Sequence, residues 1–187
     1  MDSIEQTDSE LVLASIANPN NYAGIIDRYS NALDRYICRL GVGRIEDRED
    51  LLQEIFLKTY LNLNDYDTDL KFSSWIYRIA HNETMSFFRK KHTRPKTIST
   101  DDIDEAFTID TEYNLINIVD NTISQKRIFE MIYSLEEKYR EVVILHYFEE
   151  KRYDEIADIL KKPPGTVATL LARAKAKLKT LLTEKPL

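Results

Sequence analysis

Two helical patterns, separated by a mostly polar loop, occupy residues 49–91 of this chain. In each of them apolar residues recur at the spacing of one face of an α-helix, which predicts a buried stripe. The first stripe consists of Leu52, Ile55, Phe56 and Leu63, and the second consists of Ile76, Ile79, Ala80 and Phe87.

Each helix also carries a second stripe with a different composition. The first helix has a polar face with one apolar end, which suits docking against a partner: Asp50, Gln53, Glu54 and Leu57. The second helix has a face that can reach phosphates and base edges together: Arg78, His81, Asn82, Met85 and Arg89. Aromatic rings that can stack on unpaired bases lie beside it, at Phe72, Trp75 and Tyr77. Such aromatic-rich amphipathic helices more often simply belong to a core.

The preceding residues predict two more helices. Polar residues 7–10 can cap a first helix, which the Asn- and Pro-containing residues 18–21 would end. A longer amphipathic pattern runs over residues 22–40, and the charged residues 44–49 are expected to form a turn. Residues 1–91 therefore predict a four-helix unit.

The composition changes after this unit. Residues 92–124 are acidic and predict a flexible linker, and a second helical domain is expected over residues 125–187. Ser134 and Glu137 have the spacing of a capping box for the helix that follows. The apolar stripe of that helix is Tyr139, Val142, Val143, His146 and Tyr147, which makes His146 a core or boundary residue rather than a ligand.

The end of the chain has the pattern of a helix-turn-helix. A short helix over residues 153–160 precedes a Pro- and Gly-containing turn, and a longer helix is expected from Thr166 to about Leu182. The positions of the long helix that should pack inward are Val167, Leu171, Ala174 and Leu178. Together with only four glycines and five prolines in the whole chain, these patterns predict an all-α protein of two helical domains.

The charge distribution is more informative than the net charge of −6. Residues 1–91 have 11 basic and 15 acidic side chains (−4), residues 92–124 have 2 and 7 (−5), and residues 125–187 have 13 and 10 (+3). Basic residues are concentrated at 89–96 and 161–179. Because phosphate binding is local and is screened within about 10 Å, this pattern fits a protein that binds DNA weakly alone and more strongly within a larger assembly.

No pattern in the chain indicates catalysis or a metal site. The sequence has no glycine-rich phosphate loop, no H-E-x-x-H and no G-x-S-x-G, so we expect neither an enzyme nor a bound cofactor. Three histidines and the single Cys38 do not form a familiar metal-binding spacing. The lone cysteine, the acidic N-terminus and the lack of an apolar run of about 20 residues predict a cytoplasmic protein without membrane insertion.

Two segments in a fixed order carry a family resemblance. DLLQEIF, followed about fifteen residues later by FSSWIYRIAHN, resembles region 2 of the extracytoplasmic-function sigma factors of bacterial RNA polymerase. EIADIL followed by PPGTVATLLARAKAKL resembles region 4 of the same family. The resemblance covers most of the chain and implies a subunit that binds core RNA polymerase, recognises the −10 and −35 promoter elements and helps to melt DNA. Such proteins are commonly restrained by an anti-sigma factor, although no residue here identifies one.

The resemblance also implies a role for individual residues. The polymerase-binding residues would be Asp50, Gln53, Glu54 and Leu57. The residues for the −10 element and for melting would be Lys71, Phe72, Ser73, Trp75, Tyr77, Arg78, His81, Asn82, Arg89 and Lys90, with the loop 64–71 accepting a flipped base. The residues for the −35 element would be Thr166, Thr169, Arg173 and Lys177.

One departure from the family pattern leaves alternatives open. Ala168 and Leu170 occupy two positions where the family usually has a basic residue that touches DNA. The chain could therefore be a sigma-like accessory subunit with a weakened −35 reader. A stand-alone, dimeric helix-turn-helix repressor that binds a palindrome is the other alternative.

Overall fold

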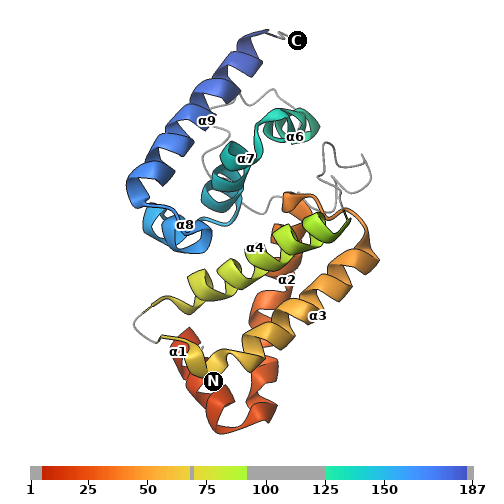
Figure 1. Cartoon of the computed structure of the whole chain (residues 1–187), viewed down its shortest axis with the longest axis vertical. Coiled ribbons are helices and arrows are strands. Elements are labelled where there is room, and N and C mark those ends of the chain that lie inside the picture. Colours follow the sequence, from red (N-terminus) through yellow and green to blue (C-terminus); the bar gives the residue numbers. More distant parts are fainter. Residues whose placement is uncertain (1–5, 68–69, 92–124, 185–187) are drawn as a thin grey trace, which may run out of the picture.

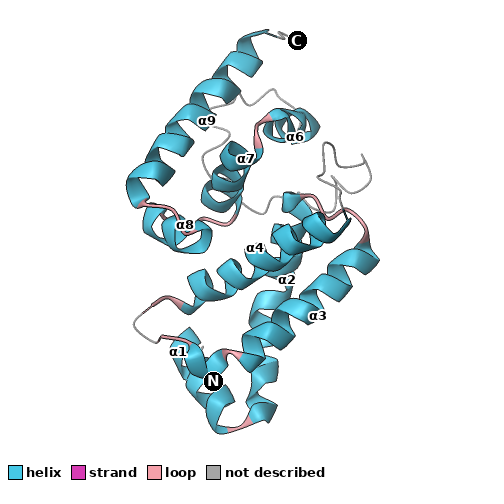
Figure 2. Cartoon of the chain, viewed as in Figure 1, coloured by secondary structure: helices cyan, strands magenta, loops and turns pink. Residues whose placement is uncertain are grey.

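The computed structural model describes residues 6–67, 70–91 and 125–184. In these ranges helices are joined by short loops, and no strand is present (Figure 2). The helices form two bundles that pack against each other (Figure 1). This confirms the expected all-α class with two helical domains. The predicted linker, residues 92–124, lies outside the described residues.

The first bundle contains the four helices that the sequence predicts. Its elements are α1 (Asp8–Ala17), η1 (Pro19–Tyr22), α2 (Ala23–Leu40), α3 (Ile45–Leu61), η2 (Leu63–Asp65) and α4 (Phe72–Lys91). A capping box starts α1, because the Thr7 hydroxyl accepts from the Glu10 amide while the Glu10 carboxylate accepts from the Thr7 amide at 2.7 Å. Gly41, with φ 118°, ends α2 in the left-handed conformation that glycine adopts most easily.

The expected charged turn over residues 44–49 is wrong, because α3 already begins at Ile45. Glu46 and Asp47 lie in the first helical turn, where carboxylates interact favourably with the helix dipole. Arg48 is buried and donates to the Asp34 carboxylate and the Gly43 carbonyl. The charges that suggested a turn therefore belong to the first turn of α3, and Arg48 ties this turn to α2.

The second bundle contains the helix-turn-helix. Its elements are α6 (Gln125–Ser134), α7 (Glu137–Val143), the π-helical turn η3 (Ile144–Phe148), α8 (Tyr153–Leu160) and α9 (Pro164–Glu184). The four positions of α9 that were predicted to pack inward are at most 3% exposed. The helix begins two residues before Thr166, because proline is well tolerated in the first turn.

The capping box predicted at Ser134 is wrong. The Ser134 hydroxyl instead donates to the Met131 carbonyl at the end of α6, and Glu136 is the N-cap residue of α7 without a side-chain cap. Serine competes well for such backbone carbonyls, so the S-x-x-E spacing alone did not identify the cap. His146 is half-buried, and its Nδ1 lies 3.0 Å from the Lys151 carbonyl, as expected for a structural histidine.

The two bundles share one apolar core. Buried side chains of both bundles belong to a single cluster, with α8 lying against α4 and η3 lying against α2. In Figure 1, α4 is accordingly seen between the rest of the first bundle and α8. This packing decides which of the predicted site residues can be reached from solvent.

Candidate protein-docking and nucleic-acid interfaces

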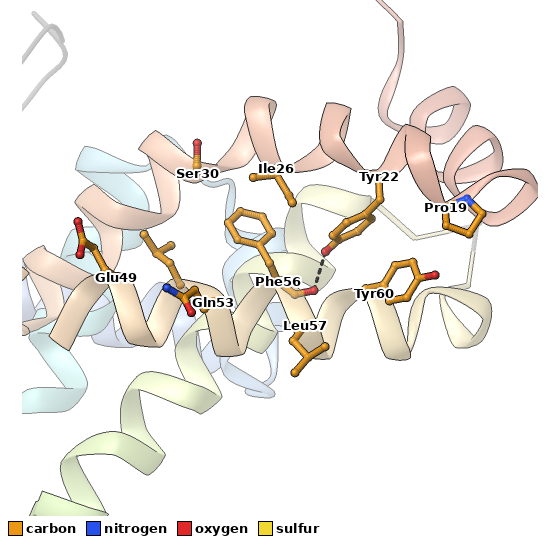
Figure 3. A pocket seen from close by; sticks show the side chains of 10 residues that line it. Pro19, Tyr22, Ile26, Ser30, Glu49, Gln53, Phe56, Leu57 and Tyr60 are labelled. Carbon is orange, nitrogen blue, oxygen red and sulfur yellow. Dashed lines mark hydrogen bonds between the residues drawn. The ribbon is translucent and has the colours of Figure 1, made fainter. Parts of the chain in front are cut away.

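An apolar groove of about 680 Å³ lies between α2 and α3 (Figure 3). Gln53 and Leu57, both predicted docking residues, line it together with Ile26, Phe56 and Tyr60. The Tyr22 hydroxyl donates to the Phe56 carbonyl at 2.7 Å, which holds the two helices together at the groove. This hydrogen bond ties the start of α2 to α3 at one end of the groove.

The side chains at the groove are unusually apolar for a surface. Leu57 is 59% exposed, and Ile26 and Tyr60 are also exposed. Asp50 and Glu54 are exposed on the same helix, and Glu49 contributes a carboxylate to the lining of the groove. An exposed apolar patch with polar neighbours is typical of a protein-binding site.

The aromatic residues at the start of α4 belong mainly to the core of the first bundle. Phe72 is 2% exposed and Trp75 is 8% exposed. The ring of Tyr66 packs against both, with centroid distances of 5.3 Å to each ring. The expectation that these two rings offer open faces for stacking bases is not met in this arrangement. The loop that precedes them includes residues 68–69, which lie outside the described residues.

Tyr77 and His81 are buried for a different reason, because the second bundle covers them. The Tyr77 hydroxyl donates to the Glu149 carboxylate at 2.8 Å, and the Lys151 amine lies 4.1 Å from the centre of the Tyr77 ring. Burial, and next the Glu149 carboxylate, raise the pKa of Tyr77 well above its ordinary value, so the hydroxyl remains a donor. His81 lies between the bundles, 3.7 Å from a carboxylate oxygen of Glu141.

The predicted cations on the same side are also paired with the second bundle. Lys71 lies 3.1 Å from the Glu155 carboxylate, and Arg78 lies 4.0 Å from the Asp158 carboxylate. Asn82, Arg89 and Lys90 are exposed, while Ser73 is half-buried. The predicted nucleic-acid face of α4 is thus divided into a covered part near Tyr77 and an exposed part toward its C-terminal end.

Sequence reasoning missed the ion pair at the centre of this contact. Arg39 of α2 and Glu149, which follows η3, lie 2.7 Å apart, and each side chain is only 4% exposed. The two residues are 110 positions apart in the chain. No local pattern marks either residue as an interface residue, so no signal in this one sequence could have paired them.

The long helix α9 presents its four predicted DNA-binding residues to solvent. Thr166, Thr169, Arg173 and Lys177 are all exposed. The Lys177 amine is paired with the Glu136 carboxylate at 2.9 Å, whereas the Thr169 hydroxyl donates to the Gly165 carbonyl of its own helix.

The interpretation of Leu170 as a lost DNA contact is wrong. Leu170 is 9% exposed and belongs to the apolar core, so its side chain faces the bundle rather than a DNA groove. Only Ala168, which is half-buried, remains as a departure near the surface. A weakened −35 reader is therefore supported by one residue instead of two.

The environment of His81 predicts a pH dependence of stability. Burial, and next Lys162, lower the pKa of His81 to about 4 from the ordinary 6.5. Between these values the unfolded chain binds a proton that the folded chain does not, so the free energy of unfolding should fall as the pH is lowered through this window. The loss from this residue should reach at most about 3 kcal/mol.

Two other groups face the His81 ring. The Tyr36 hydroxyl of α2 lies 3.1 Å from Nδ1 and remains neutral at these pH values, and the Glu141 carboxylate favours the charged ring and reduces the loss. Urea unfolding at a series of pH values measures the effect, and His81→Asn should flatten the curve between pH 6.5 and 4. An equally steep curve for the variant would contradict the assignment.

The described residues contain no cluster of three potential metal-binding side chains. Within the same residues, no helix combines the length and apolar character needed to cross a membrane.

Comparison with known families and proteins gives matches over both bundles. The family model of Sigma-70 region 2 matches residues 25–94, and that of Sigma-70, region 4 matches residues 125–178. The ECF RNA polymerase sigma factor SigW of Bacillus subtilis (strain 168) is 33% identical over 175 residues, which cover 87% of this chain and 89% of SigW. SigM of the same organism, also an ECF RNA polymerase sigma factor, is 32% identical over 84% of this chain and 92% of its own length.

Solved structures share the fold. CnrH in complex with the cytosolic domain of CnrY gives a TM-score of 0.70 at 21% identity, covering 94% of this chain and 97% of CnrH. The sigma factor RpoE of Bartonella quintana, in complex with the anti-sigma factor NepR, gives a TM-score of 0.63 at 20% identity. This match covers 89% of this chain and 99% of the RpoE chain. Both similarities extend over the two bundles.

Proposed function

Because this chain belongs to the extracytoplasmic-function sigma factors of RNA polymerase, we propose that its two bundles divide the work of promoter recognition. As a sigma factor it acts in transcription initiation and carries promoter specificity rather than catalysis. The family membership supports this function over a stand-alone helix-turn-helix repressor. The observation that favours it among the surfaces is the apolar groove between α2 and α3, which a free repressor would not need.

In this proposal the core polymerase binds at the groove. Leu57 would insert into the partner, Gln53 would pair with a polar group that is desolvated on docking, and Asp50 and Glu54 would form the charged rim. An interface of this kind, with an apolar centre and a polar edge, is the usual arrangement in protein complexes. Polar residues at the rim of an interface contribute more to the orientation of the complex and to its rate of association than to its affinity.

The downstream promoter element would be bound by α4 and the loop before it. Asn82, Arg89 and Lys90 are exposed and could contact the strand and its phosphates directly. Ser73 would contribute from the start of α4. The four residues that contact the second bundle would join when that bundle moves away: Lys71, Tyr77, Arg78 and His81. Phe72 and Trp75 would act chiefly by shaping this surface from beneath. Strand separation costs a few kcal/mol for each unstacked step, which such contacts can offset without ATP.

The upstream element would be bound by α9 in the major groove. Arg173→Ala is expected to lower initiation at the cognate promoter by about tenfold, because a bidentate contact of arginine with a base discriminates by about 1–3 kcal/mol. The measurement is transcript yield from the cognate promoter and from a promoter with a scrambled upstream element. On the scrambled promoter, the variant and the wild type should give equal yields. Lys179→Ala, also an exposed basic residue of α9, serves as the matched control. Equal losses on both promoters would contradict base readout by Arg173.

A run-off transcription assay with purified core enzyme tests the function as a whole. Adding this chain should give a defined transcript from a cognate promoter, found by mapping the start sites that appear when the chain is overexpressed. Tight binding to duplex DNA without any binding to core enzyme would overturn the proposal. A cytoplasmic location follows from such a role, and an anti-sigma factor, like the NepR that was solved with RpoE, stays an expectation.

A further inference from the structure

The side chains of α9 restrict the bases that this helix can read. Residues 164–177, the N-terminal two thirds of the helix, contain no asparagine, glutamine, aspartate or glutamate. Amide side chains are the usual bidentate partners of adenine, and carboxylates accept from cytosine, so neither kind of pairing is available here. Arg173 can pair with guanine. Apart from the basic residues, only small side chains remain on the exposed face for the other base pairs.

Methyl groups are the main chemical feature of those small side chains. Thr166 and Thr169 lie one helical turn apart, Ala172 lies one turn beyond Thr169, and all three are exposed. In a helix-turn-helix, the N-terminal residues of the second helix contact the base edges in the major groove. Thymine is the base that presents a methyl group there, and the methyl groups of alanine and threonine are its usual apolar contacts.

A hydrogen bond of Thr169 decides which part of its side chain faces outward. The hydroxyl donates to the Gly165 carbonyl at 2.8 Å, four residues earlier in the same helix. Because the oxygen is held against the backbone of the previous turn, the methyl group is the substituent of Cβ that points away from it. The hydroxyl hydrogen is already used, so the oxygen can only accept. An accepting oxygen would favour adenine or cytosine, whereas an outward methyl group favours thymine.

We propose that Thr169 reads a thymine of the upstream promoter element, through contact of its methyl group with the C5-methyl group of the base. Thr169 thereby contributes base specificity beside Arg173, which lies one turn further along α9. The contact removes both methyl groups from water and needs no hydrogen bond between protein and base. This inference rests on the proposed binding of α9 in the major groove.

Replacing single thymines of the upstream element by uracil tests the contact from the side of the DNA. Uracil lacks only the C5-methyl group and keeps every hydrogen-bonding group of thymine. The full chain bound to core enzyme is titrated with promoter fragments that carry one uracil each, and fluorescence anisotropy gives the affinity. Loss of one buried methyl contact should weaken binding by about fourfold at one position of the element.

Two substitutions at the same position separate the methyl group from the hydroxyl. Thr169→Val keeps a methyl group and the β-branched shape without the hydroxyl, whereas Thr169→Ser keeps the hydroxyl without the methyl group. Serine, valine and threonine have similar helix propensities, so the stability of α9 should be comparable in both variants. Thr169→Val should keep the preference for thymine over uracil at that position, and Thr169→Ser should lose it.

Thr180→Ser is the matched control. Thr180 is also exposed, its hydroxyl donates to the Ala176 carbonyl at 3.1 Å, and it lies about 16 Å further along the helix. This variant should keep the thymine preference. If Thr169→Ser keeps the preference, if Thr169→Val loses it, or if every uracil is tolerated by the wild type, the inference is overturned.

Transcript yields separate this inference from the proposed function. A wild type whose yield falls when the upstream element is scrambled, but which tolerates every uracil, sinks the inference alone. Failure of core enzyme with this chain to initiate at any promoter sinks the proposed function.

Discussion

Replacing Leu57 by lysine is expected to weaken binding to core RNA polymerase by about 30-fold or more, the loss of about 2 kcal/mol that marks an interface hot spot. The side chain is 59% exposed and lines the groove between α2 and α3. A lysine there would bring an ammonium group into the apolar contact that the proposed docking buries. Lysine and leucine have similar helix propensities, so the free energy of unfolding should change by less than about 0.5 kcal/mol.

Leu13→Lys is the control for this experiment. Leu13 is 58% exposed on α1 and does not line the groove, so the substitution introduces the same charge at the same degree of exposure. Binding of fluorescently labelled chain to core enzyme, measured by titration, should be unchanged for Leu13→Lys. If both leucine variants bind as tightly as the wild type, polymerase does not dock on the groove.

The helices could be predicted because their signals are local. The 3.6-residue recurrence of Val167, Leu171 and Leu178 gives the buried face of α9 directly, and all three are buried. The start of α3 could not be read in this way. Its first turn is charged, and one of those charges is the buried Arg48, whose partner Asp34 comes from another helix.

The docking surface and the strand-binding surface differ in how far the sequence reveals them. The docking residues lie on one face of α3, and helical spacing alone predicts that face; Leu57 is indeed exposed. The covering of Tyr77 depends on Glu149, 72 residues away, and on the packing of one bundle on another. Leu170 was misread for a related reason, since its position was judged by family pattern while its burial depends on packing within the bundle.

Trp75→Ala is expected to lower the free energy of unfolding by about 3–5 kcal/mol, the usual cost of removing a buried aromatic side chain. Trp75 is 8% exposed, and its ring lies 5.3 Å from that of Tyr66 and 5.6 Å from that of Phe72. Urea unfolding followed by far-UV circular dichroism measures the loss. Fluorescence cannot serve, because Trp75 is the only tryptophan of the chain.

Two control variants decide what the loss means. Trp75→Phe keeps a ring against Tyr66 and Phe72 and should lose clearly less stability than Trp75→Ala. Asn82→Ala lies on the same helix but is exposed, so its stability should stay within about 0.5 kcal/mol of the wild type. A Trp75→Ala variant as stable as Asn82→Ala would show that the ring is not part of the core. If Trp75 is confirmed as a core residue, a promoter-opening defect of Trp75→Ala would reflect damage to the whole of α4. Binding of the displaced strand would then have to be tested by substituting exposed residues such as Asn82.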